Sequence, residues 1–533
     1  MKRAAALVCA AVFCLCPSSA ERAAAAGAAL HELTFADGSD VQKLNPLLIT
    51  TYEENYTAQL TGAFLTRLGP DRKPVAELAR EVPSQRNGGV SADGKTIVYH
   101  LRPNLRWSDG SPLTAADVVF TARCIIAKDT PVASTSGWDQ IVSVSSPRPG
   151  DVRFQLKAPY SPAFYTYFAS YNGYAILPER LLRGVDLRTA PFNQLPVGAG
   201  PFRYASFRRG DRVIMEANPY YYRGRPKLDR LVFKFVPDEN TVTTQVLTGE
   251  IDLALSVQPT QLARLEGAPG VTLLERPSGR TGYIGFLTTK PPLDDPRVRL
   301  ALRDGLDRRE ILQKIYRGHG SIWDDPVTPL DPFFGGGVRA ADPDLGRAAA
   351  LLDSAGWRAG PDGLRRRNGV PLTLDFVDQT GNDIGLHIVE LARAQWAKLG
   401  VTVSARTVNG DVVFALDGLA AHGDYGALVY GAFTISTDIE QTYACKGRPP
   451  HGFNYSRYCN PKVDAALARA NATYDDALRQ RLYLQARRML AADVPDIPTI
   501  HREDIFALRP AVRGFHPNGL TMFDDVSNLD VQR

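Results

Sequence analysis

The sequence predicts an α/β protein in which helices cover β-sheets. Its 533 residues, 44% hydrophobic and 22% charged, are enough for roughly two to four domains with a large core. Helical patterns alternate with short strand-like runs, and this mixture argues against an all-helical or all-β fold. The helical patterns lie at 114–127, 239–248, 307–317, 345–355, 384–399 and 474–492, and the strand-like runs at 96–101, 231–236, 251–255, 372–377, 401–407 and 426–430.

The first segment, 1–20, has the features of a secretory signal peptide. Positive charge on Met1-Lys2-Arg3 precedes an apolar run from Ala4 to Cys16 and the small residues Ser18-Ser19-Ala20, which suit cleavage. The apolar run is short for a bilayer span, although a membrane anchor stays the alternative. No later stretch is long and apolar enough to cross a membrane. We therefore expect an exported, periplasmic protein.

Local signals around residues 95–117 set the first element boundaries. KTIVYHL (95–101) is rich in β-branched and aromatic residues, which favours a strand. Asp109-Gly110 suits a tight turn, and Thr114-x-x-Asp117 can satisfy free amide groups where a helix begins. We expect a strand, a turn and a capped helix in quick succession.

Two later helices have equally clear boundaries. Asp307-Arg308-Arg309-Glu310 predicts a capping box, in a helix that ends near Gly318. The helical pattern at 384–399 stops at Gly400 and leads directly into the strand-like run at 401–407. Such a helix-to-strand unit is typical of a layered sheet.

The charge balance argues against a nucleic-acid partner. The chain has 62 Lys and Arg against 57 Asp and Glu, a formal net charge of +5. The basic run Arg365-Arg366-Arg367 lies between the turn signals Asp362-Gly363 and Asn368-Gly369, and we expect it at a solvated hairpin edge. This pattern does not create the basic surface that nucleic acid requires.

The common catalytic signatures are missing, so the sequence predicts a protein that is not an enzyme. There is no G-x-S-x-G elbow, H-E-x-x-H motif or P-loop, and Gly198-Ala199-Gly200-Pro201 lacks the third glycine of a dinucleotide-binding motif. The eight histidines lack metal-ligand spacing, so we expect no metal and no cofactor. A Ser/His/Asp triad assembled in space stays open, which makes an exported hydrolase the competing class.

The cysteines predict one disulfide. Cys445 and Cys459 flank a short loop, and in an oxidising compartment we expect them to be bonded. Cys124 lies in a predicted amphipathic helix, where a buried free thiol is expected.

Several segments resemble the extracytoplasmic solute-binding proteins of family 5, the receptors of ABC importers for dipeptides, oligopeptides and nickel. These segments follow one another in family order: LRPNLRWSDGSPLTAADVVFTA (101–122), the stretch 197–255 that begins VGAGPFRYASFRRGDRV, GYIGFLTTKPPLDDPRVRLAL (282–302) and NYSRYCNPKVDAAL (454–467). Several separate motifs in the same order make a chance match improbable.

The resemblance implies a two-lobe periplasmic-binding-protein fold with an extra α/β domain inserted in the first lobe. By that analogy the core of the first lobe is 29–45, 197–280 and 501–533, its extra domain is 46–196, and the second lobe is 281–500. The chain would cross between the lobes near 280–283 and 500–503.

The function implied by the resemblance is that of a monomeric receptor. Two lobes close over a peptide or peptide-like solute, and ABC permease subunits in the membrane accept it. Receptors for a nickel chelate, an opine or an oligosaccharide occur in the same family and stay open as alternatives.

Asp438 is the acid that the resemblance places against the α-ammonium group of a peptide. The stretch 423–443 resembles the strand and loop that present the family's aspartate, but FTIST (433–437) replaces its usual run rich in Asp and Pro. This departure puts dipeptide specificity in doubt. Asp438 also begins Asp-Ile-Glu-Gln, so it could cap a helix with Gln441 reaching back, and the two roles are compatible.

Four further residues are candidate ligand contacts by the same resemblance. Thr51 and Tyr52 follow the LNPL segment (44–47), Trp138 lies in SGWDQI, and Tyr283 stands at a proposed crossing. For the aromatic residues the alternative is packing in the core. Arg280 suits a ligand carboxylate, but a solvated hinge arginine is the simpler interpretation.

Overall fold

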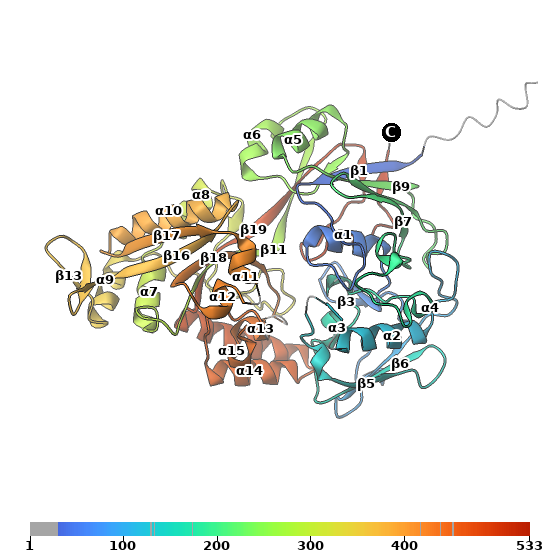
Figure 1. The fold of residues 1–533 in the computed structure, drawn as a ribbon, viewed down its shortest axis with the longest axis horizontal. Helices are drawn as coiled ribbons and strands as arrows, with labels where there is room; N and C mark the ends of the chain where they lie inside the picture. The colour runs from blue at the N-terminus through green and yellow to red at the C-terminus, as the bar shows by residue number, and fades with distance from the viewer. Residues whose placement is uncertain are drawn as a thin grey trace, which may run out of the picture.

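The computed structural model describes residues 30–532 except 128–129, 133, 173, 416, 437–438 and 450–451, so the predicted signal peptide lies outside the described residues. Figure 1 shows two lobes side by side. The first lobe contains α1–α6, and the second contains α7–α15. Helices and strands alternate as the sequence predicted, and the α/β class is confirmed.

One mixed sheet runs through both lobes. Among the described residues it has 11 strands, ordered β17-β16-β18-β11-β19-β10-β1-β9-β8-β7, with β12 paired to β19. The strands of the first lobe are β1 (Glu32–Asp37), β7 (Phe202–Arg208), β8 (Arg212–Ala217), β9 (Arg230–Phe235) and β10 (Leu253–Ala254). Those of the second lobe are β12 (Gly320–Ser321), β16 (Thr373–Gln379), β17 (Thr402–Val408) and β18 (Ala427–Phe433).

Two long antiparallel strands connect the lobes. They are β11 (Thr272–Phe286) and β19 (Asp496–Leu508), and both predicted crossings fall inside them. Residues 280–286 of β11 pair with β18, whereas residues 272–277 pair only with β19. The register between the two strands shifts near residues 277–283, where the sheet passes from one lobe to the other.

Among the described residues, the rest of the first lobe contains three small sheets and several helices. One sheet has the order β4-β6-β5, one pairs β2 with β3, and one pairs β20 with β21. The strands are β2 (Thr66–Leu68), β3 (Pro74–Ala76), β4 (Thr96–His100), β5 (Ile141–Ser145) and β6 (Asp151–Leu156), with β20 (Val512–Arg513) and β21 (Asp530–Val531) near the end of the chain. The helices are α1 (Tyr52–Thr61), α2 (Ala115–Ile126), α3 (Ala163–Thr166), α4 (Glu179–Leu182), α5 (Glu239–Thr248) and α6 (Leu262–Leu265).

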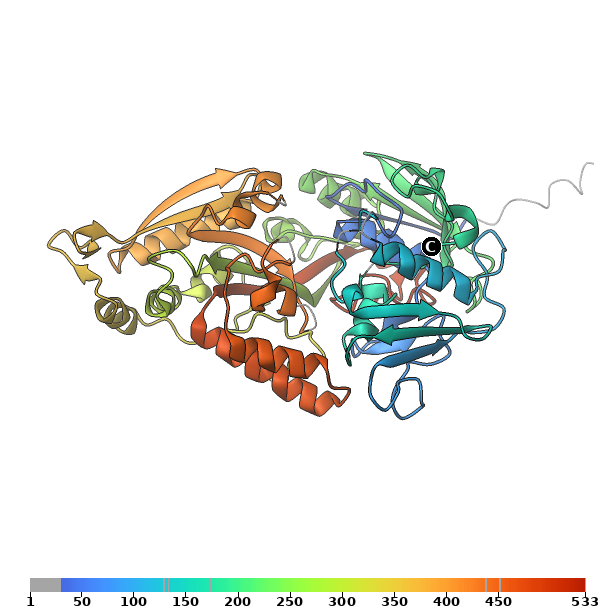
Figure 2. The ribbon, with the colours of Figure 1, turned by 60° about the horizontal axis from the view of Figure 1, so that its bottom comes forward.

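The second lobe is richer in helices. They are α7 (Pro296–Asp304), α8 (Arg308–Lys314), α9 (Leu345–Ser354), α10 (Asp383–Ala397), α11 (Gly410–Phe414), α12 (Leu419–His422), α13 (Ile439–Tyr443), α14 (Pro461–Asn471) and α15 (Asp476–Asp493). Helices α14 and α15 pack against each other, and in Figure 2 they extend toward the first lobe. Of the described helices, none combines the length and apolar character that a membrane crossing requires.

Local capping explains where two predicted helices begin. At α2, the Asp117 carboxylate accepts a hydrogen bond of 2.8 Å from the Thr114 N–H, as the sequence predicted. At α8, Asp307 caps the helix by accepting from the Arg309 N–H at 3.0 Å. A capping box also requires the Glu310 side chain to accept from the Asp307 N–H. This part of the prediction is wrong, because the Glu310 side chain contacts Lys314 and Gln395 instead.

The arginine hairpin also differs from the prediction. Its turns lie at the expected places, between β13 (Arg358–Ala359), β14 (Arg365–Arg367) and β15 (Val370–Pro371). Arg365, however, is buried and donates to the carbonyls of Leu399 and Trp357 at 2.8 and 2.6 Å. The prediction of a solvated edge is therefore wrong for Arg365, because its guanidinium satisfies carbonyl groups that would otherwise be buried without partners.

Candidate ligand-binding cleft

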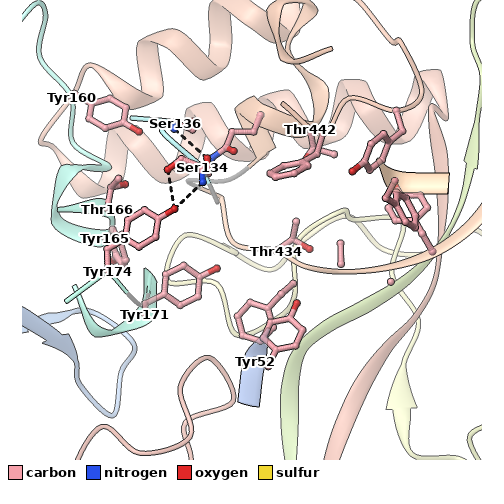
Figure 3. A pocket seen from close by; sticks show the side chains of 18 residues that line it. Tyr52, Ser134, Ser136, Tyr160, Tyr165, Thr166, Tyr171, Tyr174, Thr434 and Thr442 are labelled. Atoms are coloured by element: carbon pink, nitrogen blue, oxygen red, sulfur yellow. Dashed lines mark hydrogen bonds between the residues drawn. The ribbon is translucent and has the colours of Figure 1, made fainter. Parts of the chain in front are cut away.

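A cavity of about 440 Å³ lies between the two lobes. Side chains from both lobes line it, and Figure 3 shows them around a common space. The first lobe contributes Tyr52, Ser134, Ser136, Tyr160, Tyr165, Thr166, Tyr171 and Tyr174, and the second contributes Phe414, residues 430–434, Gln441, Thr442, Phe453 and Tyr455.

The start of α1 holds Tyr52 at the mouth of this cavity. Thr51 is the N-cap of α1, and it forms a capping box with Glu54. Tyr52 is the first residue of α1, and its side chain is 41% exposed. The ring lies 5.4 Å from the Phe433 ring of the second lobe, and the Arg280 guanidinium lies 5.1 Å from its centre.

A tyrosine-rich segment forms the rest of the first-lobe wall. Seven of the fifteen residues from 160 to 174 are aromatic. The Tyr174 hydroxyl accepts a hydrogen bond of 2.8 Å from the Ser134 N–H and donates one of 3.0 Å to the Ser134 carbonyl (Figure 3). This pair of bonds attaches the loop around Ser134 to the tyrosine-rich segment.

The second-lobe wall combines the end of β18 with the loop between the two cysteines. Cys445 and Cys459 form the predicted disulfide, with their Cα atoms 4.4 Å apart. Cys124 is the cysteine among the described residues that is outside a disulfide, and its expected full burial is wrong, because it is only half-buried on α2. The loop between the bonded cysteines contributes Phe453 and Tyr455 to the cavity. The Tyr455 ring also packs edge-on against Tyr430, 6.2 Å away.

The described part of this wall is aromatic and hydroxyl-rich, without an ionised side chain. None of the described lining residues of the 440 Å³ cavity is Asp, Glu, Lys, Arg or His. Burial raises the pKa of Tyr430 well above its usual value, so its hydroxyl stays protonated, and it donates to the buried Asp496 behind the wall. Such a surface offers rings for stacking and hydroxyl groups for hydrogen bonds.

Charged groups lie in a second cavity of about 610 Å³ that continues from the first. Both cavities are lined by Ser134, Tyr160 and Phe453, among others. Asp139, Glu440 and Lys446 line only the second cavity, where the Lys446 ammonium lies 2.6 Å from the Glu440 carboxylate. The combined space therefore has a neutral aromatic part and a charged part.

The predicted contact residues occupy different layers of the site. Tyr52 lines the cavity, whereas Thr51 supports it as the helix cap. Tyr283 is 1% exposed and lies behind the wall, where its hydroxyl donates to the Pro326 carbonyl at 2.6 Å and its ring stacks on Tyr430.

Trp138 is also 1% exposed and packs against Tyr167, Phe168 and Tyr174, and it lines neither cavity. Asp438 lies outside the described residues.

Sequence reasoning missed most of the aromatic wall. The high aromatic content of residues 160–174 was the available signal, but the same content is typical of a core segment. Tyr167 and Phe168 in that segment are core residues that do not line the cavity. Tyr165 and Tyr174 belong to the same core and also line the cavity, as do the less buried Tyr160 and Tyr171.

Two lobes joined by two strands, with a cavity between them, define a solute-binding protein of the two-lobe class. Residues 73–447 match the family model of bacterial extracellular solute-binding proteins, family 5, and the chain belongs to this family. The resemblance seen in the sequence and the two-lobe fold are both confirmed.

Known relatives cover most of the chain. It is 26% identical to the oligopeptide-binding protein AppA of Bacillus subtilis, over 85% of this chain and 83% of AppA. It is 26% identical to heme-binding protein A of Haemophilus influenzae, over 82% of each chain. The structure of B. subtilis AppA in complex with a nonapeptide superposes with a TM-score of 0.80 at 24% identity, covering 94% of this chain and 99% of AppA. NikZ of Campylobacter jejuni in complex with Ni(L-His) gives a TM-score of 0.78 at 21% identity, covering 94% of this chain and 99% of NikZ.

Proposed function

We propose that this protein is the extracytoplasmic receptor of an ABC importer, and that it captures a small peptide or peptide-like solute between its lobes. The observation that carries the proposal is the cavity itself, because residues of both lobes line it. A ligand that contacts both walls binds the closed form more tightly than the open form, and so favours closure. The closed receptor then delivers the intact solute to the permease.

The size and chemistry of the cavity support a small organic solute. Its volume, about 440 Å³, falls in the range of small-molecule sites. Peptide binding is the activity named for AppA of B. subtilis and for the dipeptide-binding protein of Escherichia coli, which is 25% identical over 82% of this chain. The rings and hydroxyl groups of the wall can accommodate varied side chains of a bound peptide, and water molecules can bridge ligand and protein.

A peptide also requires a partner for its α-ammonium group. We propose Asp438 for this role, from its place in the sequence after β18. Replacing Asp438 with Asn should cost about 2–5 kcal/mol of peptide binding, because the ligand charge loses its partner. Asp424→Asn in the same lobe is the control, since Asp424 is exposed and lines neither cavity. A variant at position 438 that binds as tightly as wild type would remove the ammonium-binding assignment.

An oligosaccharide receptor is the second candidate, and the neutral aromatic wall favours it. Aromatic faces suit the apolar faces of sugars, and none of the described residues lining the 440 Å³ cavity carries an ionised carboxylate for an ammonium group. Asp438→Asn separates the two candidates, because an uncharged sugar would lose little affinity in that variant.

The experiment that tests the receptor role is native mass spectrometry of the purified mature protein, followed by titration of a peptide library. We expect saturable binding and recovery of the bound peptide intact. Cleavage of the library would instead support the competing exported hydrolase. Export itself, through the segment 1–20, is tested by N-terminal sequencing of the secreted chain.

A comparison of ligand affinity in the Tyr52→Ala variant and in Tyr220→Ala, its matched control, tests whether the ligand binds between the lobes. The two rings are 41% and 43% exposed, but only Tyr52 lines the cavity. Loss of the Tyr52 ring should weaken ligand binding by about 1–2 kcal/mol, because an aromatic contact between ligand and protein is lost. Equal affinities in the two variants would contradict a site between the lobes.

A further inference from the structure

Three side chains that can bind a metal converge on the strands that connect the lobes. They are Glu275 of β11, Glu503 of β19 and His319, which lies in the turn between α8 and β12. One carboxylate oxygen of each glutamate and one ring nitrogen of the histidine all lie within 4.8 Å of one another. These residues line neither part of the cleft, so the cluster is separate from the solute site.

The pairing of the strands explains why these residues meet. Glu503 lies directly opposite Pro277, so Glu275 is its diagonal neighbour on the same face of the sheet. Gly320, which follows His319, is paired with Arg502. The imidazole is thereby placed beside Glu503, and its Nδ1 lies 3.0 Å from the Glu275 carboxylate.

The charges of the cluster are incompletely balanced. Among the described residues, no lysine or arginine forms an ion pair with Glu275 or Glu503, and the only ion pair involving them joins Glu275 to His319. Two carboxylates held this close repel each other, and a bound cation removes that repulsion.

We propose that Glu275, His319 and Glu503 bind a divalent transition-metal cation, and that zinc is the preferred ion. One imidazole nitrogen and two carboxylate oxygens are a donor set that zinc accepts, with water at a fourth position. Ligand atoms around tetrahedral zinc lie about 3.4 Å apart, so the three groups need only a small adjustment. Calcium and magnesium prefer oxygen ligands alone, and the imidazole disfavours both.

The position of the site predicts an effect on the hinge. Glu275 and Glu503 lie in the part of the two strands beyond the pairing with β18, and His319 follows a helix of the second lobe. A cation bound by all three therefore links the second lobe to the strands that lead into the first lobe (Figure 1).

Zinc binding to untagged mature protein, freed of metal by EDTA, tests the proposal. We expect one equivalent of zinc by elemental analysis and a saturable calorimetric titration. His319→Ala and Glu503→Gln should each weaken binding at least about tenfold, because a direct ligand is lost. Glu503→Gln keeps the size of the side chain, and its unchanged melting temperature without metal would show that folding is intact.

His100→Ala is the matched control. His100 lies 2.6 Å from the Asp151 carboxylate, a similar pair that belongs to no three-ligand group among the described residues. This variant should bind zinc like wild type. The proposal is overturned if the wild type binds no stoichiometric zinc, if the His319 and Glu503 variants bind it unchanged, or if calcium binds equally well. The first two results would leave only an ion pair between His319 and Glu275, and the third would leave a cation site without preference for zinc.

Discussion

Asp496 is a buried carboxylic acid directly behind the wall of the cleft. The Tyr443 hydroxyl donates a hydrogen bond of 2.6 Å to it. Burial raises the pKa of Asp496 from 3.8 to about 7, and hydrogen bonds from Tyr443 and Tyr430 only partly oppose that rise. The folded protein therefore holds a proton on Asp496 more tightly than the unfolded chain does.

This difference predicts how stability changes with pH. The contribution of Asp496 is fully present below pH 3.8 and is lost as the pH rises to about 7, because the folded-state pKa lies above the unfolded value. Asp496→Asn keeps an acceptor for Tyr443 but does not ionise. Urea unfolding between pH 4 and 7 should show the wild type losing up to about 4 kcal/mol relative to this variant.

Asp362→Asn is the control for that measurement. Asp362 is exposed and bonded to Arg366, which lowers its pKa to about 2, so its charge does not change between pH 4 and 7. Its substitution should leave the slope of stability against pH unaltered in that range. Parallel curves for wild type and Asp496→Asn would contradict the assignment of a buried proton.

Single residues also show the limit of sequence reasoning about the site. Tyr52 and Trp138 were both candidate contacts, and the structure places one at the cavity and the other in the core. Aromatic residues suit either environment, since both are apolar and both accept rings. Tyr52 begins α1 and Trp138 begins a short 3-10 helix, and only the tertiary fold decides which of the two helix starts faces the second lobe.

At the scale of elements, a buried ion pair fixes α15 to the loop that follows β12. The Arg487 guanidinium lies 3.1 Å from the Asp325 carboxylate, and both side chains are 0% exposed. Arg487 also donates to the carbonyls of Phe333 and Phe334. The helix and the loop are therefore held together by one cation with several partners.

Asp325→Ala should destabilise the fold by about 3–5 kcal/mol, because Arg487 would remain buried without its counter-charge. The exposed pair of Arg393 and Glu390 on α10, 2.9 Å apart, provides the comparison. Glu390→Ala should cost less than about 1 kcal/mol. Chemical denaturation measures both, and similar losses in the two variants would contradict a special role for the buried pair.

The loop closed by Cys445 and Cys459 predicts a further effect. The bond closes a loop with a sequence separation of 14, and the loop presents Phe453 and Tyr455 to the cavity. Replacing both cysteines with serine should cost roughly 3 kcal/mol in the chain-entropy model and weaken ligand binding, because the loop gains freedom. Thermal unfolding and calorimetry measure the two effects.

Alkylation provides the direct check of this disulfide. The denatured, non-reduced mature protein should accept one label, on Cys124. Three labelled thiols would contradict the bond.

Elements were more predictable than their environments. The boundaries of α5, α10 and the turn at Asn368-Gly369 follow from caps and turn residues, which act within a few positions of the chain. The burial of Arg365 does not, because its carbonyl partners at Leu399 and Trp357 are brought to it only by tertiary folding.

At the scale of the whole molecule, the lobes contact each other on the side away from the hinge. The Tyr474 hydroxyl, between α14 and α15, donates a hydrogen bond of 3.0 Å to the Gly94 carbonyl of the first lobe. The Ser161 N–H donates to the Asn471 carbonyl at 2.7 Å. With β11 and β19 on the other side, these contacts bound the cavity, and the described arrangement is a closed one.

The order of the long sheet could not be derived from strand patterns. Strand β19 pairs with β11, β10 and β12, although far-separated parts of the chain form them. The two-lobe arrangement came from resemblance to a family, which carries long-range information that local patterns lack. The exact domain limits at 46, 197, 281 and 501 stay predictions.

The last prediction concerns closure. Opening separates the direct contacts between the lobes, among them the hydrogen bonds at Tyr474 and Ser161 and ring contacts such as Tyr52 on Phe433, and it bends the two connecting strands. Without solute, the open form should become populated, because no ligand then adds contacts that favour closure. A solute that contacts both walls favours the closed form by the difference between its affinities for the two forms. Small-angle scattering of the mature protein should therefore give a smaller radius of gyration with a saturating ligand than without it. A radius that is unchanged at saturation would mean that the lobes are already closed without solute, and that the cleft binds by a rigid fit.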